Sequence, residues 1–148
     1  ENFMKTSIPT RGQRERELSQ RIQGLYSNQL GHRPTKVTCQ LFDDSLAIVM
    51  EDSITPAEQL LVEQGQEDLA EQVRSGLDDA IEPRLKALIE EVLEVGVLDL
   101  MGDATLQTGR SGIVVVLSNT PEVRNPDAIP KAKPKVSNGK NGDRPSME

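Results

Sequence analysis

The stretch KVTCQLFDDSLAIVMEDSITPAEQLLVE, residues 36–63, decides the fold. Apolar and polar residues alternate over 37–42, which is the period of a half-buried strand. The pair Asp43-Asp44 follows, and its short polar side chains tolerate the backbone angles of a turn. The next run, 46–50, is apolar on both faces, as in a strand deep in a sheet. The sequence therefore predicts a β-hairpin whose second strand is the more buried.

The residues Thr55-Pro56-Ala57-Glu58 predict the start of a helix directly after the hairpin. The Thr55 hydroxyl can accept a hydrogen bond from the amide of Glu58, whose carboxylate can accept one from the amide of Thr55. Proline suits the first helical position because no N–H donor is needed there.

Another helix is predicted before the hairpin, over residues 10–30. Thr10 and Gln13 have the spacing of a second capping box. Apolar residues then recur at helical spacing up to Gly31, which suits a left-handed stop. Residues 1–9 show no periodicity, and this predicts a flexible N-terminus.

Two helices follow the hairpin. The first, over 56–64, is predicted to turn Leu60 and Leu61 inward. The second, over 67–95, contains Pro83, which removes a helical hydrogen bond, so we expect one long helix with a kink. Its predicted apolar stripe consists of Leu69, Val73, Leu77, Ala80, Ile81, Leu85, Leu88, Ile89 and Val92.

The last regular elements are predicted to be strands over 97–101 and 112–118, the second apolar on both faces and therefore central. The segment between them is polar and rich in glycine, which indicates a long hairpin loop. Residues 119–148 combine proline and lysine with few apolar side chains, which predicts a disordered tail. A short docked segment around 123–129 is the alternative for its first part.

The element order is therefore α-ββ-αα-ββ. It predicts an α+β fold, with one four-stranded, mainly antiparallel sheet and helices packed on one face, in a single domain over residues 10–118. Such a sheet leaves two edges and one face uncovered. Dimerisation through either long helix would cover them, so we expect a homodimer.

Composition limits the environment of the chain. Among 148 residues there is one cysteine, which excludes an internal disulfide and favours a reducing compartment, so a cytoplasmic location is expected. The N-terminus lacks the apolar region of a secretory signal. The aliphatic runs are far shorter than the about 20 residues of a membrane-spanning helix, so we expect no transmembrane segment.

Charge is segregated along the chain. Residues 1–40 carry seven basic and three acidic residues, residues 41–108 carry three and 17, and residues 109–148 carry seven and four. A basic first third and an acidic middle attract one another, within one chain or between two. The alternative is that they form two separate solvated surfaces.

No set of residues points to catalysis. With a single histidine, no nucleophilic triad is recognisable, and no metal-ligand spacing or phosphate-binding loop is present, so no metal or cofactor is expected. The acidic pairs are neighbours in sequence and do not predict converging acid and base groups. Nucleic acid is disfavoured because the chain is acidic and has few aromatic residues.

Three short segments are candidate binding sites. His32 and Arg33, in a glycine- and proline-containing loop, could contact an anion or only connect two elements. Arg110, between glycines, could help form an anion-binding nest or simply occupy a hairpin tip. Cys39 could be a redox-sensitive thiol or a small core residue.

The segments RGQRERELSQRIQGLYSNQLGHRPTKVTCQLFDDSLAIVMEDSITPAEQLL, EQVRSGLDDAI and VLDLMGDATLQTGRSGIVVVL resemble the MpsC domain family, with a match over roughly residues 12–117. The family is named after a Na+-translocating membrane-potential-generating system, and the chain looks closest to its cyanobacterial members. The resemblance implies a small component beside a membrane transport system, and it adds Arg74 and Asp103 as candidate ligand-binding residues. Pro83 and the basic tail depart from the family pattern.

Three hypotheses for the function remain. The first is a non-enzymatic, homodimeric accessory or regulatory protein, with a membrane-associated protein as a further partner. The second is a binding module for a small anionic metabolite, using Arg33 and Arg110. The third is an uncharacterised enzyme.

Overall fold

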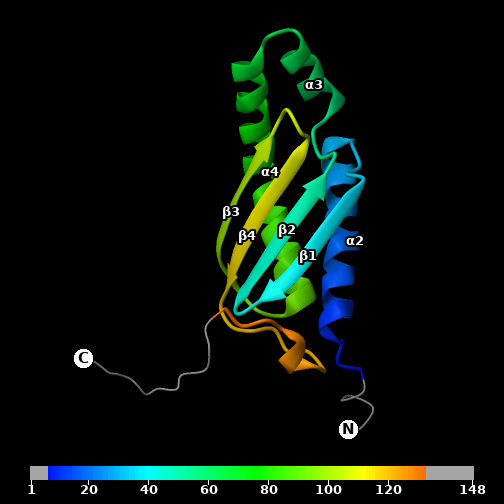
Figure 1. The fold of residues 1–148 in the computed structure, drawn as a ribbon, viewed down its shortest axis with the longest axis vertical. Helices are drawn as coiled ribbons and strands as arrows, with labels where there is room; N and C mark the ends of the chain where they lie inside the picture. The colour runs from blue at the N-terminus through cyan, green and yellow to red at the C-terminus, as the bar shows by residue number, and fades with distance from the viewer. Residues whose placement is uncertain (1–6, 133–148) are drawn as a thin grey trace, which may run out of the picture.

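The computed structural model describes residues 7–132 and shows a four-stranded sheet with its long helices on one side (Figure 1). Three α-helices, four strands and one short 3-10 helix make up this part of the chain. They are α2 (Arg11–Leu30), β1 (Lys36–Phe42), β2 (Ser45–Glu51), α3 (Pro56–Glu63), α4 (Glu67–Leu93), β3 (Val97–Thr105), β4 (Arg110–Leu117) and η1 (Pro126–Ala128).

The sheet has the order β1-β2-β4-β3, and every neighbouring pair is antiparallel. The two strands that the sequence predicts to be central, β2 and β4, lie in the middle. Helices α2 and α4 pack against the same face, while the opposite face is open in Figure 1. The predicted α+β fold is confirmed.

The local signals in the sequence act as predicted. Thr10 and Thr55 each form a capping box, with Gln13 and Glu58 respectively. Gly31 ends α2 in the left-handed conformation, with φ of 69°. In the first hairpin, Asp43 has φ of 49°, a conformation that aspartate tolerates better than most residues.

The core lies between the helices and the inner face of the sheet. Alternate residues of the strands point inward and meet one apolar side of α2 and the second half of α4. Cys39 belongs to this core, and burial raises the pKa of its thiol to about 11, while a hydrogen bond with Ser19 opposes the shift. The completely buried members include Leu18, Ile22, Leu41, Leu46, Ile54, Ile89, Leu93 and Val115.

The second hairpin is longer and tighter than the sequence predicts. β3 extends to Thr105, so the predicted strand over 97–101 is too short and the predicted loop over 102–111 is wrong. Gly102 pairs with Ile113 and Asp103 pairs with Gly112. β3 is an edge strand, and its polar outward residues conceal the strand pattern because they face solvent.

The helical stripe is also only partly buried. α4 is a single helix through Pro83, as predicted, and its second half carries most of the predicted core residues. Leu60, Leu69 and Val73 are exposed, which contradicts their predicted inward positions. The reason is visible in Figure 1: α3 and the first half of α4 form a hairpin that projects beyond the end of the sheet.

The domain continues beyond residue 118, where the sequence analysis places the start of the disordered tail. Val123 and Ile129 are buried in the core, as in the alternative of a docked segment. The guanidinium of Arg14 donates to the carbonyl oxygen of Glu122 over 2.8 and 3.2 Å. Residues packed in the core therefore continue at least to Ile129, and residues 133–148 of the predicted tail lie outside the described residues.

Gly102→Ala tests the tight packing of β3. A Cβ at residue 102 would lie 2.8 Å from Cγ1 of Ile113 and 2.9 Å from the carbonyl oxygen of Gly112. We expect the free energy of unfolding to fall by about 1–3 kcal/mol, because the strands must move apart. Urea denaturation measures this change.

Gly112→Ala is the matched control, since a Cβ there would meet nothing within 4 Å. Its effect should be within about 0.5 kcal/mol of zero. Equal losses in the two variants would contradict the close approach at Gly102.

Candidate functional site

A buried ion pair joins the two helices of the projecting hairpin. Arg74 on α4 donates from Nε to Oε2 of Glu58 over 2.7 Å and from Nη2 to Oε1 over 2.6 Å. Arg74 is 4% exposed and Glu58 is not exposed at all. This bidentate geometry, with two parallel N–H···O bonds, is the strongest arrangement between a guanidinium and a carboxylate.

Further hydrogen bonds tie the ion pair to the sheet. The amide and the hydroxyl of Thr55 both donate to Oε1 of Glu58, over 3.0 and 2.8 Å. Nη2 of Arg74 also donates to the carbonyl oxygen of Ser53, and the Ser53 hydroxyl lies 2.7 Å from that of Ser111 on β4. One continuous polar network therefore links α3, α4 and the end of the sheet.

The network keeps both partners charged. Burial raises the pKa of Glu58, but the hydrogen bonds from Arg74 and Thr55 outweigh this effect, so the pKa lies below its ordinary value. Burial lowers the pKa of Arg74, but the bonds to Glu58 and Asp78 raise it further above its ordinary value. Neither group exchanges protons near neutral pH, and the pair is a structural element.

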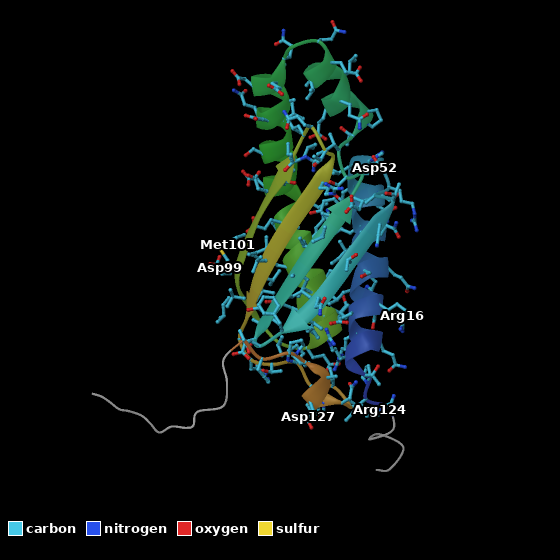
Figure 2. The ribbon with its side chains drawn as sticks, viewed as in Figure 1. Arg16, Asp52, Asp99, Met101, Arg124 and Asp127 are labelled. Carbon is cyan, nitrogen blue, oxygen red and sulfur yellow. The ribbon has the colours of Figure 1, made fainter. Side chains whose placement is uncertain are left out.

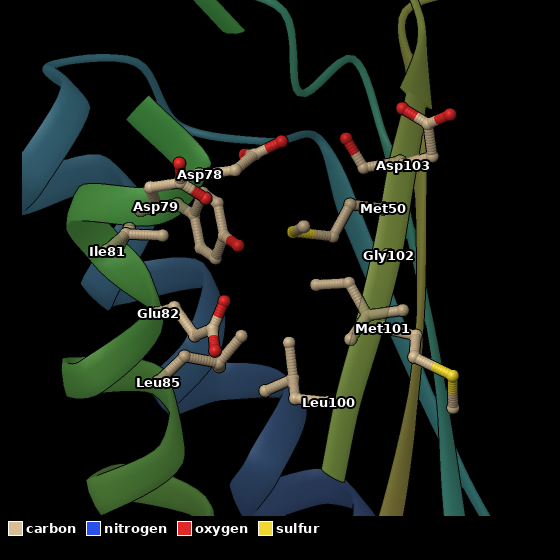
Figure 3. Close-up of a pocket in the computed structure, with 13 residues that line it drawn as sticks. Met50, Asp78, Asp79, Ile81, Glu82, Leu85, Leu100, Met101, Gly102 and Asp103 are labelled. Carbon is tan, nitrogen blue, oxygen red and sulfur yellow. The ribbon is translucent and has the colours of Figure 1, made fainter. Parts of the chain in front are cut away.

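A cavity of about 350 Å³ lies next to this network, between α4 and the strands (Figure 3). β3 directs Leu100, Gly102 and Ala104 to the inner face, and the last two are too small to fill the space against α4. The apolar part of the cavity wall consists of Met50, Ile81, Leu85, Leu100 and Ile113, and the phenol of Tyr26 completes it.

The remaining wall of the cavity is acidic. Its carboxylates are those of Asp78, Asp79 and Glu82 on α4. Asp103 of β3 also borders the cavity, but like Met101 it stands at a strand position that faces the open side of the sheet. Figure 3 shows Asp78 directed from α4 toward the strands, while Met101 turns its side chain away from the cavity. Burial raises the pKa of Asp78 and the nearby Arg74 partly opposes this, so the pKa remains above its ordinary value.

A second hollow of about 340 Å³ adjoins the cavity. The two share Asp78, Asp79, Gly102 and Asp103, and the second also reaches Arg74 and Glu71. Together they form a depression along the junction of α4 and β3.

Two of the five candidate residues from the sequence line this depression. Arg74 and Asp103 both line the second hollow. Arg74 is held by Glu58, by Ser53 and by Asp78 at 3.2 Å.

The other three candidates lie outside both hollows and have partners within the chain. Nε2 of His32 is 2.9 Å from the carbonyl oxygen of Asp52. Arg33 donates to Gln23 over 3.1 Å. Nε of Arg110 lies 2.8 Å from Oε1 of Glu51.

Sequence reasoning missed Tyr26, Glu58 and Asp78 as members of the site. Tyr26 belongs to the apolar stripe of α2, and Glu58 is explained by its cap alone. The spacing of Arg74 and Asp78, four residues apart on a helix, was an available signal for an ion pair. The meeting of α4 with β3 is a tertiary feature that local patterns do not contain.

Most of the chain, including all its described α-helices and strands, matches one protein-family model. The family model described as "Na+-translocating membrane potential-generating system (MpsC)" matches residues 10–119. The chain belongs to the MpsC family. The match spans the helices and strands that form the cavity and the buried ion pair. Neither a curated protein nor a solved structure matches the chain.

The described residues, 7–132, lack two features of membrane and metal proteins. None of their helices has the length and apolar character needed to cross a membrane. No three histidine, cysteine or carboxylate side chains within this part of the chain gather closely enough to hold a metal ion.

Glu58→Gln tests the buried ion pair. The change leaves the Arg74 guanidinium buried without its counter-charge, so the free energy of unfolding at about pH 7 should fall by about 3 kcal/mol. The folded pKa of Glu58 is lowered, so its stabilising effect exists above the unfolded pKa and is lost as the pH falls through the folded pKa. The loss should therefore shrink toward about pH 3 in urea melts.

Glu63→Gln is the control, because Glu63 is an exposed carboxylate on the same helix. Its effect should stay small at both pH values. A loss in Glu58→Gln that is the same at both pH values would contradict the assigned role of the Glu58 charge.

Proposed function

We propose that the protein is a non-enzymatic accessory or regulatory protein that acts as a homodimer beside a membrane Na+-transport system. The family description supports the link to such a system. We infer the dimer from the open face of the sheet, because this face exposes apolar side chains on its central strands.

The open face is apolar along a line that crosses the sheet. Ala47 pairs with Val114, and Val114 pairs with Met101. Val49 lies beside them, and Val49, Val114 and Met101 are 44%, 42% and 49% exposed. Figure 2 shows Met101 and Asp99 at the β3 side of the sheet. A contiguous apolar patch on a sheet is the type of surface that a partner covers.

The opposite charges of the two sheet edges favour a second copy of the chain as the partner that covers the open face. The edge formed by β1 begins with Lys36 and lies beside the arginine-rich α2, whereas β3, at the opposite edge, carries Asp99 and Asp103. A two-fold axis parallel to the strands would place the β1 edge of one copy over the β3 edge of the other. The segregation of charge along the sequence then becomes an attraction between protomers.

The surroundings of the cavity support a non-enzymatic role. Its polar groups are carboxylates, one phenol and one serine hydroxyl, and this serine, Ser111, is engaged with Ser53. His32 and Cys39, the usual types of base and nucleophile, lie elsewhere in the fold.

Val114→Glu tests the dimer by placing a charge at the centre of the open face. Size-exclusion chromatography with light scattering should show a dimer for the wild type and a monomer of about half that mass for the variant, because a buried unpaired charge opposes association. A wild-type monomer at micromolar concentration would refute the homodimer.

Leu69→Glu is the matched control. Leu69 is 44% exposed, like Val49, but it lies on the projecting helical hairpin. This variant should remain a dimer. Dissociation of Leu69→Glu, with Val114→Glu still dimeric, would move the contact to the hairpin and contradict the open-face interface.

A further inference from the structure

We infer that the cavity between α4 and the strands binds a small organic ammonium ion, a cation with an apolar body and an amine group. Three independent features carry this inference: an unpartnered buried phenol, an acidic side that includes a carboxylate without an ion pair, and an apolar wall.

Tyr26 is the first feature. It lines the cavity and is only 2% exposed, yet its hydroxyl makes no hydrogen bond with any described residue. Buried phenols normally find a partner, because leaving such a group unsatisfied costs free energy. Burial, together with the charge of Asp78, raises the pKa of Tyr26 above its ordinary value, so the phenol keeps its proton. An ammonium group in the cavity would supply the missing partner by donating to the phenol oxygen.

The carboxylates are the second feature. Asp79 lines the cavity from α4 and forms no ion pair with any described residue, whereas Glu82 is paired with Lys86 at 3.2 Å. Asp103, on the outward side of β3, adds negative charge near Asp78. The nearest cation of the depression, Arg74, is already bound to Glu58, Ser53 and Asp78. The field at the cavity is therefore negative, and it selects a cation over an anion.

The apolar wall is the third feature, and it separates an organic cation from a metal ion. Ile81, Leu85 and Leu100 offer no ligand to a metal, the thioether of Met50 suits only soft metal ions, and the described carboxylates do not converge on one point. A cavity of about 350 Å³ lies at the small end of the range for ligand sites, which suits one ring or a short alkyl chain. The aromatic face of Tyr26 can add a cation–π attraction.

The cavity is separate from the proposed dimer contact. Its walls come from α2, α4 and the inner face of the sheet. Met101 borders the cavity, but its side chain turns away from it, toward the open face that it shares with Val114. Ligand binding and oligomeric state can therefore be tested independently. A result that refutes the homodimer does not refute the ammonium site, and the reverse also holds.

The experiment uses the full chain and two pairs of probes. Phenethylammonium is compared with hydrocinnamate, and hexylammonium with heptanoate, so that each pair differs mainly in the sign of the charge. Thermal unfolding at constant ionic strength with sodium chloride, followed by calorimetric titration, measures binding. At least one ammonium probe should raise Tm at millimolar concentration, and its carboxylate counterpart should not.

Three variants locate the site. Tyr26→Phe keeps the ring and removes the hydroxyl, and it should weaken ammonium binding about tenfold. Asp79→Asn removes an exposed charge with no ion pair and should weaken binding about threefold. Asp99→Asn removes the same charge on β3 outside the cavity wall and should leave the affinity within about twofold of the wild type.

Each contrary outcome overturns the inference. If neither ammonium probe changes Tm, or if each carboxylate binds as well as its ammonium partner, the cavity is not a cation site. If binding is unchanged in both Tyr26→Phe and Asp79→Asn, the ammonium ion binds elsewhere.

Discussion

The structure depends on the charge pair between Glu58 and Arg74. Placing either charge in the interior alone would be costly, so the two helices that carry them must meet in one relative position. The pair also anchors α4 to the carbonyl of Ser53, directly after β2. It thereby sets where α4 runs relative to β3, and with it the width of the cavity between them. A single ion pair thus positions both the projecting hairpin and the candidate site.

The capping box of Thr55 and Glu58 shows how one residue acts at two levels. At the level of the sequence it starts a helix, and this was predictable from four consecutive residues. In the folded chain the same carboxylate also binds Arg74, 16 residues later, and this partner was not predictable from spacing. Local and tertiary requirements converge on Glu58, which explains why a glutamate is found at a fully buried position.

The sequence predicted the fold well where local chemistry decides the structure. Capping boxes, the left-handed Gly31 and the apolar strands gave the correct elements and the correct central pair. The prediction of β3 was too short, because an edge strand buries too few residues to show an alternation of apolar and polar side chains. The predicted burial of Leu69 and Val73 was wrong, because the apolar stripe of α4 continues beyond the end of the sheet. For the candidate site, Arg74 and Asp103 were indicated only by the family resemblance. Tyr26 could not be found, because an apolar stripe does not show which of its members lacks a partner.

The segment after β4 has a consequence for the order in which the chain can fold. Arg11 contacts the carbonyl oxygen of Ala128, and the amide of Arg124 donates to the carbonyl oxygen of Pro9, so the first helix is held by residues more than 100 positions away. During synthesis, α2 emerges early but its final contacts do not yet exist. The sheet can assemble first, while the closure of the domain waits for Ile129, the last buried residue among those that the structure describes. A chain that stops before this point would keep the packing of α2 on the sheet but would lack the contacts that hold the N-terminal end of that helix.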